Sequence, residues 1–196
     1  LLAEEHYAEH VKKPFFPALI EYIMGRDHYA ATPHRRRVIA LVYSGPDAVK
    51  KVRAIAGPTN PHEAREKSPG TIRALGTVVP VKDASGKVVG DRLDNLVHAS
   101  ANLEDAEREI KLWFRPNDIM PYMQNYPVDK CHEHYYYKDD RLYTHHEPDS
   151  TCILAPGDVA WSTDLEALRK LAKGEPAPCS LRAVVAKYLI NTVREV

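Results

Sequence analysis

A short apolar segment that ends at a histidine, followed closely by an amphipathic helix, constrains the fold of this chain most. Asn95–Ser100 has the composition of a short buried strand, with His98 near its end. Leu103–Phe114 follows with apolar residues at helical spacing, and Asn102 before it is a suitable N-cap. Glu109 falls on the apolar side of this helix, where an unpaired carboxylate is costly. We therefore predict that Glu109 pairs with His98 and orients its imidazole.

Length and charge restrict the partners that we expect. The chain has 196 residues, of which 27 are basic and 27 acidic, so its formal net charge is zero. This length fits one sizeable domain with an appendage, or two small domains. A chain without net charge attracts neither nucleic acid nor an anionic membrane as a whole, and we expect neither as a partner.

The sequence also favours a cytoplasmic protein. No apolar run approaches the roughly 20 residues that cross a bilayer, and the first residues lack the pattern of a signal peptide. The three cysteines Cys131, Cys152 and Cys179 are widely and irregularly spaced. We expect reduced thiols in an intracellular protein.

Prolines and glycines divide the first two thirds of the chain into short elements. The expected helices and strands there are a helical stretch over residues 3–13, a helix from Pro17 to about Met24, a strand at Val38–Tyr43, a helix from Gly45-Pro46 to Ala56, and a hairpin from Val78–Val81 and Lys87–Val89. Residues 25–36 and 57–73 are expected to be loops, and the second is long enough to imply a function.

Six segments along residues 1–116 form a recognisable set. They are His6-Tyr7 with Lys13–Leu19, Arg53, Gly57–Pro61, Pro69–Arg73, Asn95–Ser100, and Ala106-Glu107 with Glu109-Ile110 and Trp113-Phe114. In this order they resemble the nucleoside diphosphate kinase family. One of these segments alone would be weak evidence. Their common order makes the resemblance specific.

The resemblance implies a fold and a reaction. The fold is an α+β, ferredoxin-like core in which helices cover one side of a four-stranded antiparallel sheet. In the reaction, a nucleoside triphosphate gives its terminal phosphoryl group to His98, and the phosphohistidine passes it to a nucleoside diphosphate. Glu109 then orients the imidazole, Ser100 supports the same network, and Tyr7 lies near the histidine. A neutral imidazole whose second nitrogen donates to a carboxylate is a competent nucleophile.

The resemblance also implies a nucleotide site. Arg53, Thr59 and Arg73 match positions that hold the phosphates, with Mg²⁺ bridging them, and no protein side chain is expected as a metal ligand. Asn95 matches a contact to the sugar hydroxyls. Phe15, with Leu19 beside it, matches the clamp on the base. Structural alternatives stay open: Phe15 can be a core residue, Arg53 and Arg73 can be ordinary charged residues without a phosphate role, and Tyr7 can lack a role in the site.

The chain departs from the family at its start. The family begins with a strand that carries a Lys-Pro-Asp-Gly motif, and no such motif occurs here. Its first strand, first helix and second strand have no counterpart, so only Val38–Tyr43 and Leu96–Ala99 remain of the four strands. We expect either a fragment of a longer chain or missing elements that another polypeptide supplies.

Other departures lie inside the chain and after it. Ala74-Leu75 replaces the usual Gly-Asp, and Ala101 replaces the usual aspartate. Insertions are expected near residues 25–36 and 76–94. We assign residues 1–127 to the kinase-like domain and 128–196 to a C-terminal extension, with helices over Thr163–Lys173 and from Ser180 to about Val193. The extension is rich in histidine, but its spacing fits no standard zinc site, so we favour packing over metal binding.

The resulting hypothesis is a cytoplasmic nucleoside diphosphate kinase that uses Mg²⁺ and nucleoside di- and triphosphates and forms a homo-oligomer, a hexamer or a tetramer. The alternative is an impaired family member that binds nucleotide or supports assembly, which the absent lysine strand would favour. A third hypothesis makes the extension a module for protein docking.

Overall fold

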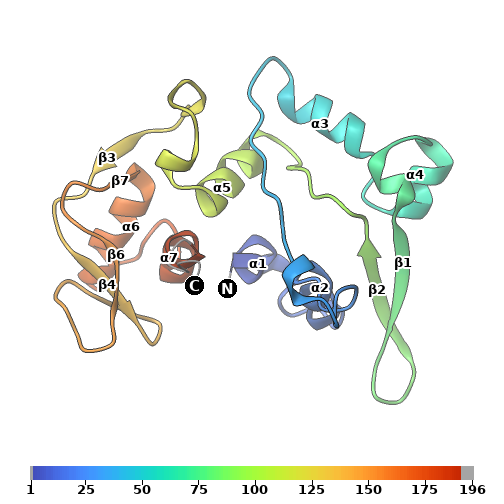
Figure 1. Cartoon of the computed structure of the whole chain (residues 1–196), viewed down its shortest axis with the longest axis horizontal. Helices are drawn as coiled ribbons and strands as arrows, with labels where there is room; N and C mark the ends of the chain where they lie inside the picture. Colours follow the sequence, from blue (N-terminus) through green and yellow to red (C-terminus); the bar gives the residue numbers. More distant parts are fainter. Residues whose placement is uncertain (1, 191–196) are drawn as a thin grey trace. The chain divides into compact units, whose positions relative to one another are not determined.

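The computed structural model describes residues 2–190 as an α+β chain of short helices and antiparallel strands, which confirms the predicted fold class (Figure 1). The chain divides into two compact units. The central unit comprises Tyr7–Glu107, and the terminal unit combines the residues up to His6 with those from Arg108 onward. Among the described residues, no helix has the length and apolar character needed to cross a membrane.

Short helices and one hairpin make up the central unit. Its elements are η1 (Ala8–His10), α2 (Phe16–Ile23), η2 (Pro33–Arg35), α3 (Ala48–Ala56), α4 (Pro61–Lys67), η3 (Ile72–Leu75), β1 (Thr77–Lys82), β2 (Val88–Asp94) and the first turn of α5 (Leu103–Trp113). The predicted helices at α2, α3 and α5 are therefore confirmed. Asn102 caps α5 as expected, since its side chain accepts a hydrogen bond of 2.8 Å from the backbone N–H of Asp105.

The predicted hairpin forms within the central unit. β1 and β2 pair antiparallel, with Thr77 opposite Asp94 and Pro80 opposite Asp91. The Asp83 carboxylate closes the turn by accepting hydrogen bonds from the backbone N–H groups of Ser85 and Lys87. Pro80 fits because neither strand has a second neighbour in this two-stranded sheet. α4 contacts β1 and α2 contacts β2, so both strands are anchored to helices.

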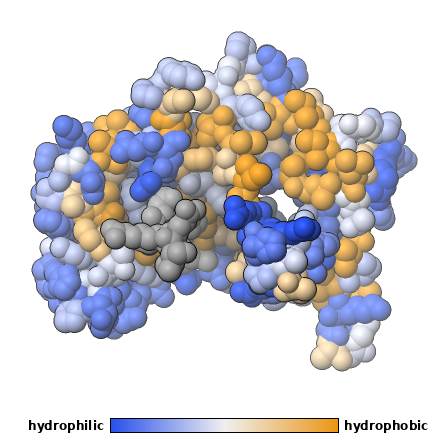
Figure 2. Space-filling view, in the orientation of Figure 1, coloured by the Kyte–Doolittle hydropathy of each residue, from blue (hydrophilic) through white to orange (hydrophobic). Residues whose placement is uncertain are grey.

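Two predicted strands do not form, and those predictions were wrong. Val38–Tyr43 and Leu96–Ala99 have no regular secondary structure. A strand needs a neighbour that accepts and donates its backbone hydrogen bonds, and residues 2–190 place none beside either segment. Ile39 is 81% exposed and Leu41 is 66% exposed, so this apolar segment lacks a core to pack against. Figure 2 shows apolar surface over the central unit, on the face that it draws.

The predicted loop over residues 57–73 contains a helix instead. Asn60 caps α4, because its side-chain oxygen accepts a hydrogen bond of 2.9 Å from the backbone N–H of His62. Pro61 occupies the first turn, where its missing N–H costs nothing. Pro61 and Ala64 are buried, so this helix packs into the unit.

The terminal unit holds the larger hydrophobic core. Its elements are α1 (Leu2–His6), the remainder of α5, η4 (Pro116–Asp118), η5 (Pro121–Met123), β3 (Val128–Lys130), β4 (Tyr135–Lys138), β5 (Arg141–Tyr143), β6 (Thr151–Leu154), β7 (Val159–Trp161), α6 (Ser162–Ala172) and α7 (Leu181–Ile190). β3 pairs with β7, and β4 lies between β5 and β6, all antiparallel. The five strands were not predicted, whereas α6 and α7 were. The part of the last predicted helix after residue 190 lies outside the described residues.

A buried ion pair lies in the core of the terminal unit. Lys187 Nζ donates to Asp164 Oδ2 at 2.6 Å, and the Tyr188 hydroxyl donates to the same oxygen at 3.2 Å. The side chains of Lys187 and Asp164 are 1% and 5% exposed. All three cysteines are free thiols, as predicted. Burial raises the pKa of the Cys179 thiol to about 11.

Candidate active site

Two predicted phosphate-binding arginines hold the backbone on either side of His98. Arg73 Nε donates to the carbonyl oxygen of Val97 at 3.2 Å, and its Nη1 donates to that of Gly57 at 2.8 Å. Arg53 Nη1 donates to the carbonyl oxygen of Ala99 at 3.4 Å. The residues before and after His98 are thus each bound to a guanidinium group. The central unit concentrates positive charge at this histidine.

The electrostatics of Arg73 reflect this arrangement. Arg73 is 3% exposed. Burial lowers the pKa of its guanidinium first, and the positive charge of Arg53 lowers it further. Two cations that repel each other in a partly dry site gain stability from an anion placed between them. A phosphate group has the charge and the acceptor oxygens for this role.

His98 is exposed, and its ring meets an aromatic neighbour. The Tyr7 ring packs against the His98 ring edge to face, with centroids 6.1 Å apart and planes at 88°. Tyr7 was predicted to lie near the histidine, and the two rings are indeed close. An exposed imidazole beside two guanidinium groups can reach a phosphate from solvent.

The predicted contacts to phosphate and sugar also lie close together. Asn95 Nδ2 donates to the backbone oxygen of Thr59 at 3.1 Å. This bond joins the end of β2 to the chain just before α4. Thr59 is exposed and Asn95 half-buried, so both side chains are accessible to a ligand.

Phe15 and Leu19, the predicted base contacts, are half-buried residues at and just after the start of α2. The Phe15 ring lies 5.8 Å from the His10 ring, centroid to centroid. A methyl group added at Gly90 of β2 would lie 3.3 Å from Phe15 Cδ1, so the hairpin backbone packs against this ring. The interpretation of Phe15 as a plain core residue is not favoured, since Phe16 beside it is the buried one.

Glu109 belongs to the terminal unit and is 8% exposed. Its carboxylate lies 3.9 Å from His6 Nε2 and 3.5 Å from Arg108 Nη2. The Trp113 indole donates to His6 Nδ1 at 3.0 Å, which leaves the His6 proton on Nε2, the nitrogen nearer Glu109. The predicted pairing of Glu109 with His98 joins residues of different units and stays a prediction, as does the support from Ser100.

His6 was quoted for the family resemblance but was not predicted as a site residue. It is 7% exposed and lies between Trp113 and Glu109. A histidine directly before Tyr7, at the end of the short helix α1, was the available signal. Within the terminal unit, His6 lies beside the Glu109 carboxylate.

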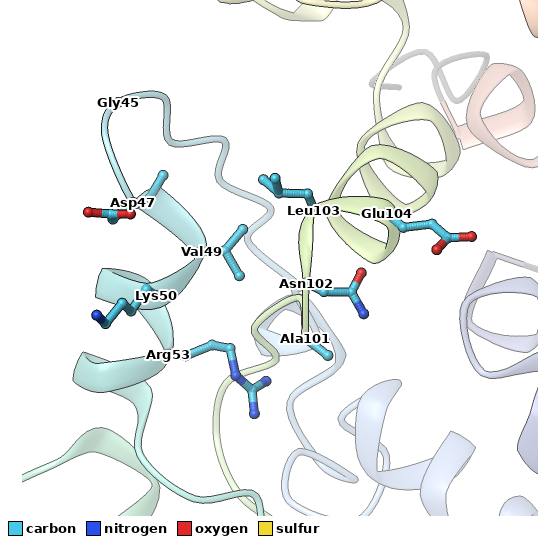
Figure 3. A pocket seen from close by; sticks show the side chains of 10 residues that line it. Gly45, Asp47, Val49, Lys50, Arg53, Ala101, Asn102, Leu103 and Glu104 are labelled. Carbon is cyan, nitrogen blue, oxygen red and sulfur yellow. The ribbon is translucent and has the colours of Figure 1, made fainter.

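An open groove lies between α3 and the start of α5 (Figure 3). Val49 and Leu103 line opposite sides of it, and Arg53 extends toward the chain at Ala101. Of the predicted site residues, only Arg53 is among the residues that line this groove. The groove is therefore next to the histidine segment and shares Arg53 with the predicted nucleotide contacts.

An exposed imidazole whose neighbouring backbone is held by two guanidinium groups is suited to phosphorylated ligands. Comparison with known proteins identifies the family. The sequence profile of the family described as nucleoside diphosphate kinase matches residues 1–119. The chain belongs to the nucleoside diphosphate kinase family.

Several curated relatives carry the name nucleoside diphosphate kinase. The protein from Pyrococcus furiosus is 42% identical over 121 residues, which are 62% of this chain and 62% of the relative. The protein from Thermus thermophilus is 41% identical over 119 residues, 61% of this chain and 69% of the relative. The protein from Staphylococcus aureus is 44% identical over 122 residues, 62% of this chain and 64% of the relative. The chain spans about 62% of the length of the Pyrococcus relatives.

Proposed function

We propose that this chain is a nucleoside diphosphate kinase that transfers phosphoryl groups through His98. The observation that supports this most strongly is the pair of guanidinium groups bound to the carbonyl oxygens of Val97 and Ala99, on either side of His98. Phosphoryl transfer depends mainly on positioning and charge neutralisation. Two fixed cations beside an exposed imidazole provide both.

The proposed reaction has two balanced steps. In the first, an imidazole nitrogen of His98 attacks the terminal phosphorus of a nucleoside triphosphate, the bond from this phosphorus to the bridging oxygen breaks, and a nucleoside diphosphate leaves. In the second, a terminal oxygen of another nucleoside diphosphate attacks the phosphohistidine, and the P–N bond breaks. Arg53 and Arg73 neutralise the phosphates in both steps, with Thr59 as a further donor.

The remaining site residues have proposed supporting roles. Glu109 accepts a hydrogen bond from the second imidazole nitrogen, Ser100 supports the same network, and Tyr7 packs beside the ring. Asn95 binds the sugar hydroxyls, and Phe15 with Leu19 binds the base. A base held by stacking is recognised with little dependence on its identity.

Magnesium fits this proposal as part of the substrate. Arg53 and Arg73, which bind the backbone on either side of His98, are cationic, and Tyr7, whose ring packs against His98, is neutral. Mg²⁺ prefers oxygen ligands and commonly binds through nucleotide phosphates. We therefore propose that the nucleotide carries the ion, which neutralises the transferred phosphoryl group. A cytoplasmic homo-oligomer, a hexamer or a tetramer, completes the proposal.

Transfer assays with two variants test this function. The chain should move the terminal phosphoryl group of ATP to another nucleoside diphosphate, and His98→Ala should abolish the transfer while leaving ADP binding within about twofold. Lys12→Ala, which removes an exposed cation elsewhere in the central unit, should behave like the original chain. Transfer by the His98→Ala variant would refute the mechanism, and nucleotide binding without any transfer would favour the impaired family member.

A further inference from the structure

An ionic cluster joins the two segments expected to be insertions. Arg92 of β2 makes a bidentate bond to Asp94, with Nε donating to Oδ1 at 2.7 Å and Nη2 donating to Oδ2 at 3.0 Å. Its remaining terminal nitrogen, Nη1, donates to Asp27 Oδ2. His28 Nε2 lies 3.4 Å from Asp94 Oδ2. Residues 25–36 and the β1–β2 hairpin are thus bound together within the central unit.

Because Asp94 is buried in this cluster, its carboxylate needs a partner of matching geometry. The Asp94 side chain is 5% exposed and the Arg92 side chain 11% exposed. A carboxylate removed from water in this way requires a fixed partner, and a guanidinium fork is the side chain that matches both of its oxygens. Tyr22 supports the arrangement, since Arg92 lies over its ring at 5.4 Å from the centroid. The hydrogen bonds that Arg92 donates to Asp94 are the main reason that the pKa of Arg92 is raised.

The cluster fixes the chain on both sides of Asn95. Asp94 precedes Asn95 and is held by Arg92. Leu96 follows it, and its backbone N–H donates to the Tyr22 hydroxyl at 3.1 Å. Leu96 has φ of 71°, a left-handed conformation that a leucine adopts only when its surroundings impose it. Asn95 therefore lies between two anchored residues, and its amide reaches Thr59.

We propose that Arg92 is a positioning residue for the nucleotide site, which holds Asn95 in place through Asp94 and so sets the recognition of the sugar hydroxyls. This inference rests on the proposed function, because the role of Asn95 does. Arg92 itself has its donors directed at Asp27 and Asp94, so it acts through the backbone at Asn95. The segments expected to be insertions, residues 25–36 and 76–94, then contribute to nucleotide binding by positioning Asn95.

Sugar discrimination tests this inference directly. The dissociation constants of ADP and of 2′,3′-dideoxy-ADP are measured by calorimetry on the full chain. The constant of the dideoxy compound divided by that of ADP gives the preference for the hydroxyls. Arg92→Met should reduce this ratio about tenfold, Arg92→Lys should restore part of it, and kcat should change less than KM. Asn95→Ala should give the same loss, and the double variant Arg92→Met with Asn95→Ala should lose nothing more.

Arg26→Met is the matched control, since Arg26 lies in the same segment but pairs with Glu21 at an exposed site. It should leave the ratio unchanged. If Arg92→Met fails to fold, Asp27→Asn, at the more exposed edge of the cluster, should reduce the ratio about threefold. An unchanged ratio in a folded variant would overturn the inference. The inference would also be overturned if the original chain did not bind ADP, or bound it no more tightly than 2′,3′-dideoxy-ADP. A chain that binds ADP with this preference but transfers no phosphoryl group would refute the proposed function alone.

Discussion

Arg73 donates from Nε to the carbonyl oxygen of Val97 at 3.2 Å, so a buried guanidinium holds the residue before His98. The same side chain reaches the carbonyl oxygen of Gly57 at 2.8 Å. It therefore joins the end of α3 to the histidine segment. A residue predicted to bind phosphate has a structural role within the central unit.

Replacing Arg73 should affect both stability and transfer. Arg73→Met removes two hydrogen bonds from a charged donor and leaves two carbonyl groups without it, so we expect a loss of about 2–3 kcal/mol in the free energy of unfolding. We also expect kcat/KM to fall at least about tenfold, because a charged hydrogen bond to phosphate is lost. Urea unfolding and steady-state kinetics measure the two effects. Activity equal to that of the original chain would exclude the phosphate role.

Gly57 should tolerate no side chain. Its φ is 86°, and an added Cβ would lie 2.2 Å from Thr71 Oγ1. Gly57→Ala therefore combines left-handed strain with a clash, and we expect a loss of roughly 2–4 kcal/mol. Gly86→Ala provides the matched control, since its φ is also 86° but nothing lies within 4 Å of the added Cβ. Equal losses in thermal unfolding of the two variants would show that Thr71 does not restrict Gly57.

Replacing one partner of the buried pair Lys187 and Asp164 should lower the free energy of unfolding. Lys187→Met leaves the Asp164 carboxylate without its main partner in the core, so we expect a loss of about 3–5 kcal/mol. The double variant Lys187→Met with Asp164→Leu removes both charges and should recover most of this loss. Chemical unfolding of the original chain, Lys187→Met, Asp164→Leu and the double variant measures the coupling. Additive losses would show that the two residues do not stabilise each other.

Asp118 should make the stability of the terminal unit depend on acid pH. Burial opposes ionisation of Asp118, but hydrogen bonds from the side chain and backbone of Arg115 outweigh it, so the pKa of this carboxyl is lowered. The folded chain then binds fewer protons than the unfolded chain. Its contribution, about 1 kcal/mol, is complete above the unfolded pKa near 3.8 and is lost as the pH falls through the lowered folded value. Asp118→Asn should lack this acid-dependent part in unfolding measured from pH 7 to pH 2, and an unchanged profile would contradict the assignment.

The parts of the fold that sequence predicted well are those fixed by local chemistry. Asn102 before an amphipathic stretch defines the start of α5, and Gly57 ends α3 because its conformation is left-handed. The Asp83–Gly86 turn likewise identifies the hairpin. Asn60-Pro61 carried the same kind of signal for α4, which was missed because a seven-residue helix in a loop rich in proline leaves little periodicity.

The failures concern interactions between distant segments. Val38–Tyr43 has the composition of a strand, but composition does not provide a neighbouring backbone. The short strands β3–β7 were missed because three or four residues are too few to show an alternating pattern. In the site, Arg53, Arg73 and Asn95 were identified from motifs, whereas the bonds of these arginines to the backbone around His98 required the structure. The same holds for the link from Arg92 to Asp94.

Phosphoenzyme labelling is the measurement that tests the central claim most directly. The full chain is incubated with γ-labelled ATP, and bound label is tested for stability in acid and alkali and located in the sequence. We predict an acid-labile, alkali-stable label on His98 that a nucleoside diphosphate removes within one turnover. Label on another residue, or a folded chain that binds ATP without acquiring label, would contradict transfer through His98.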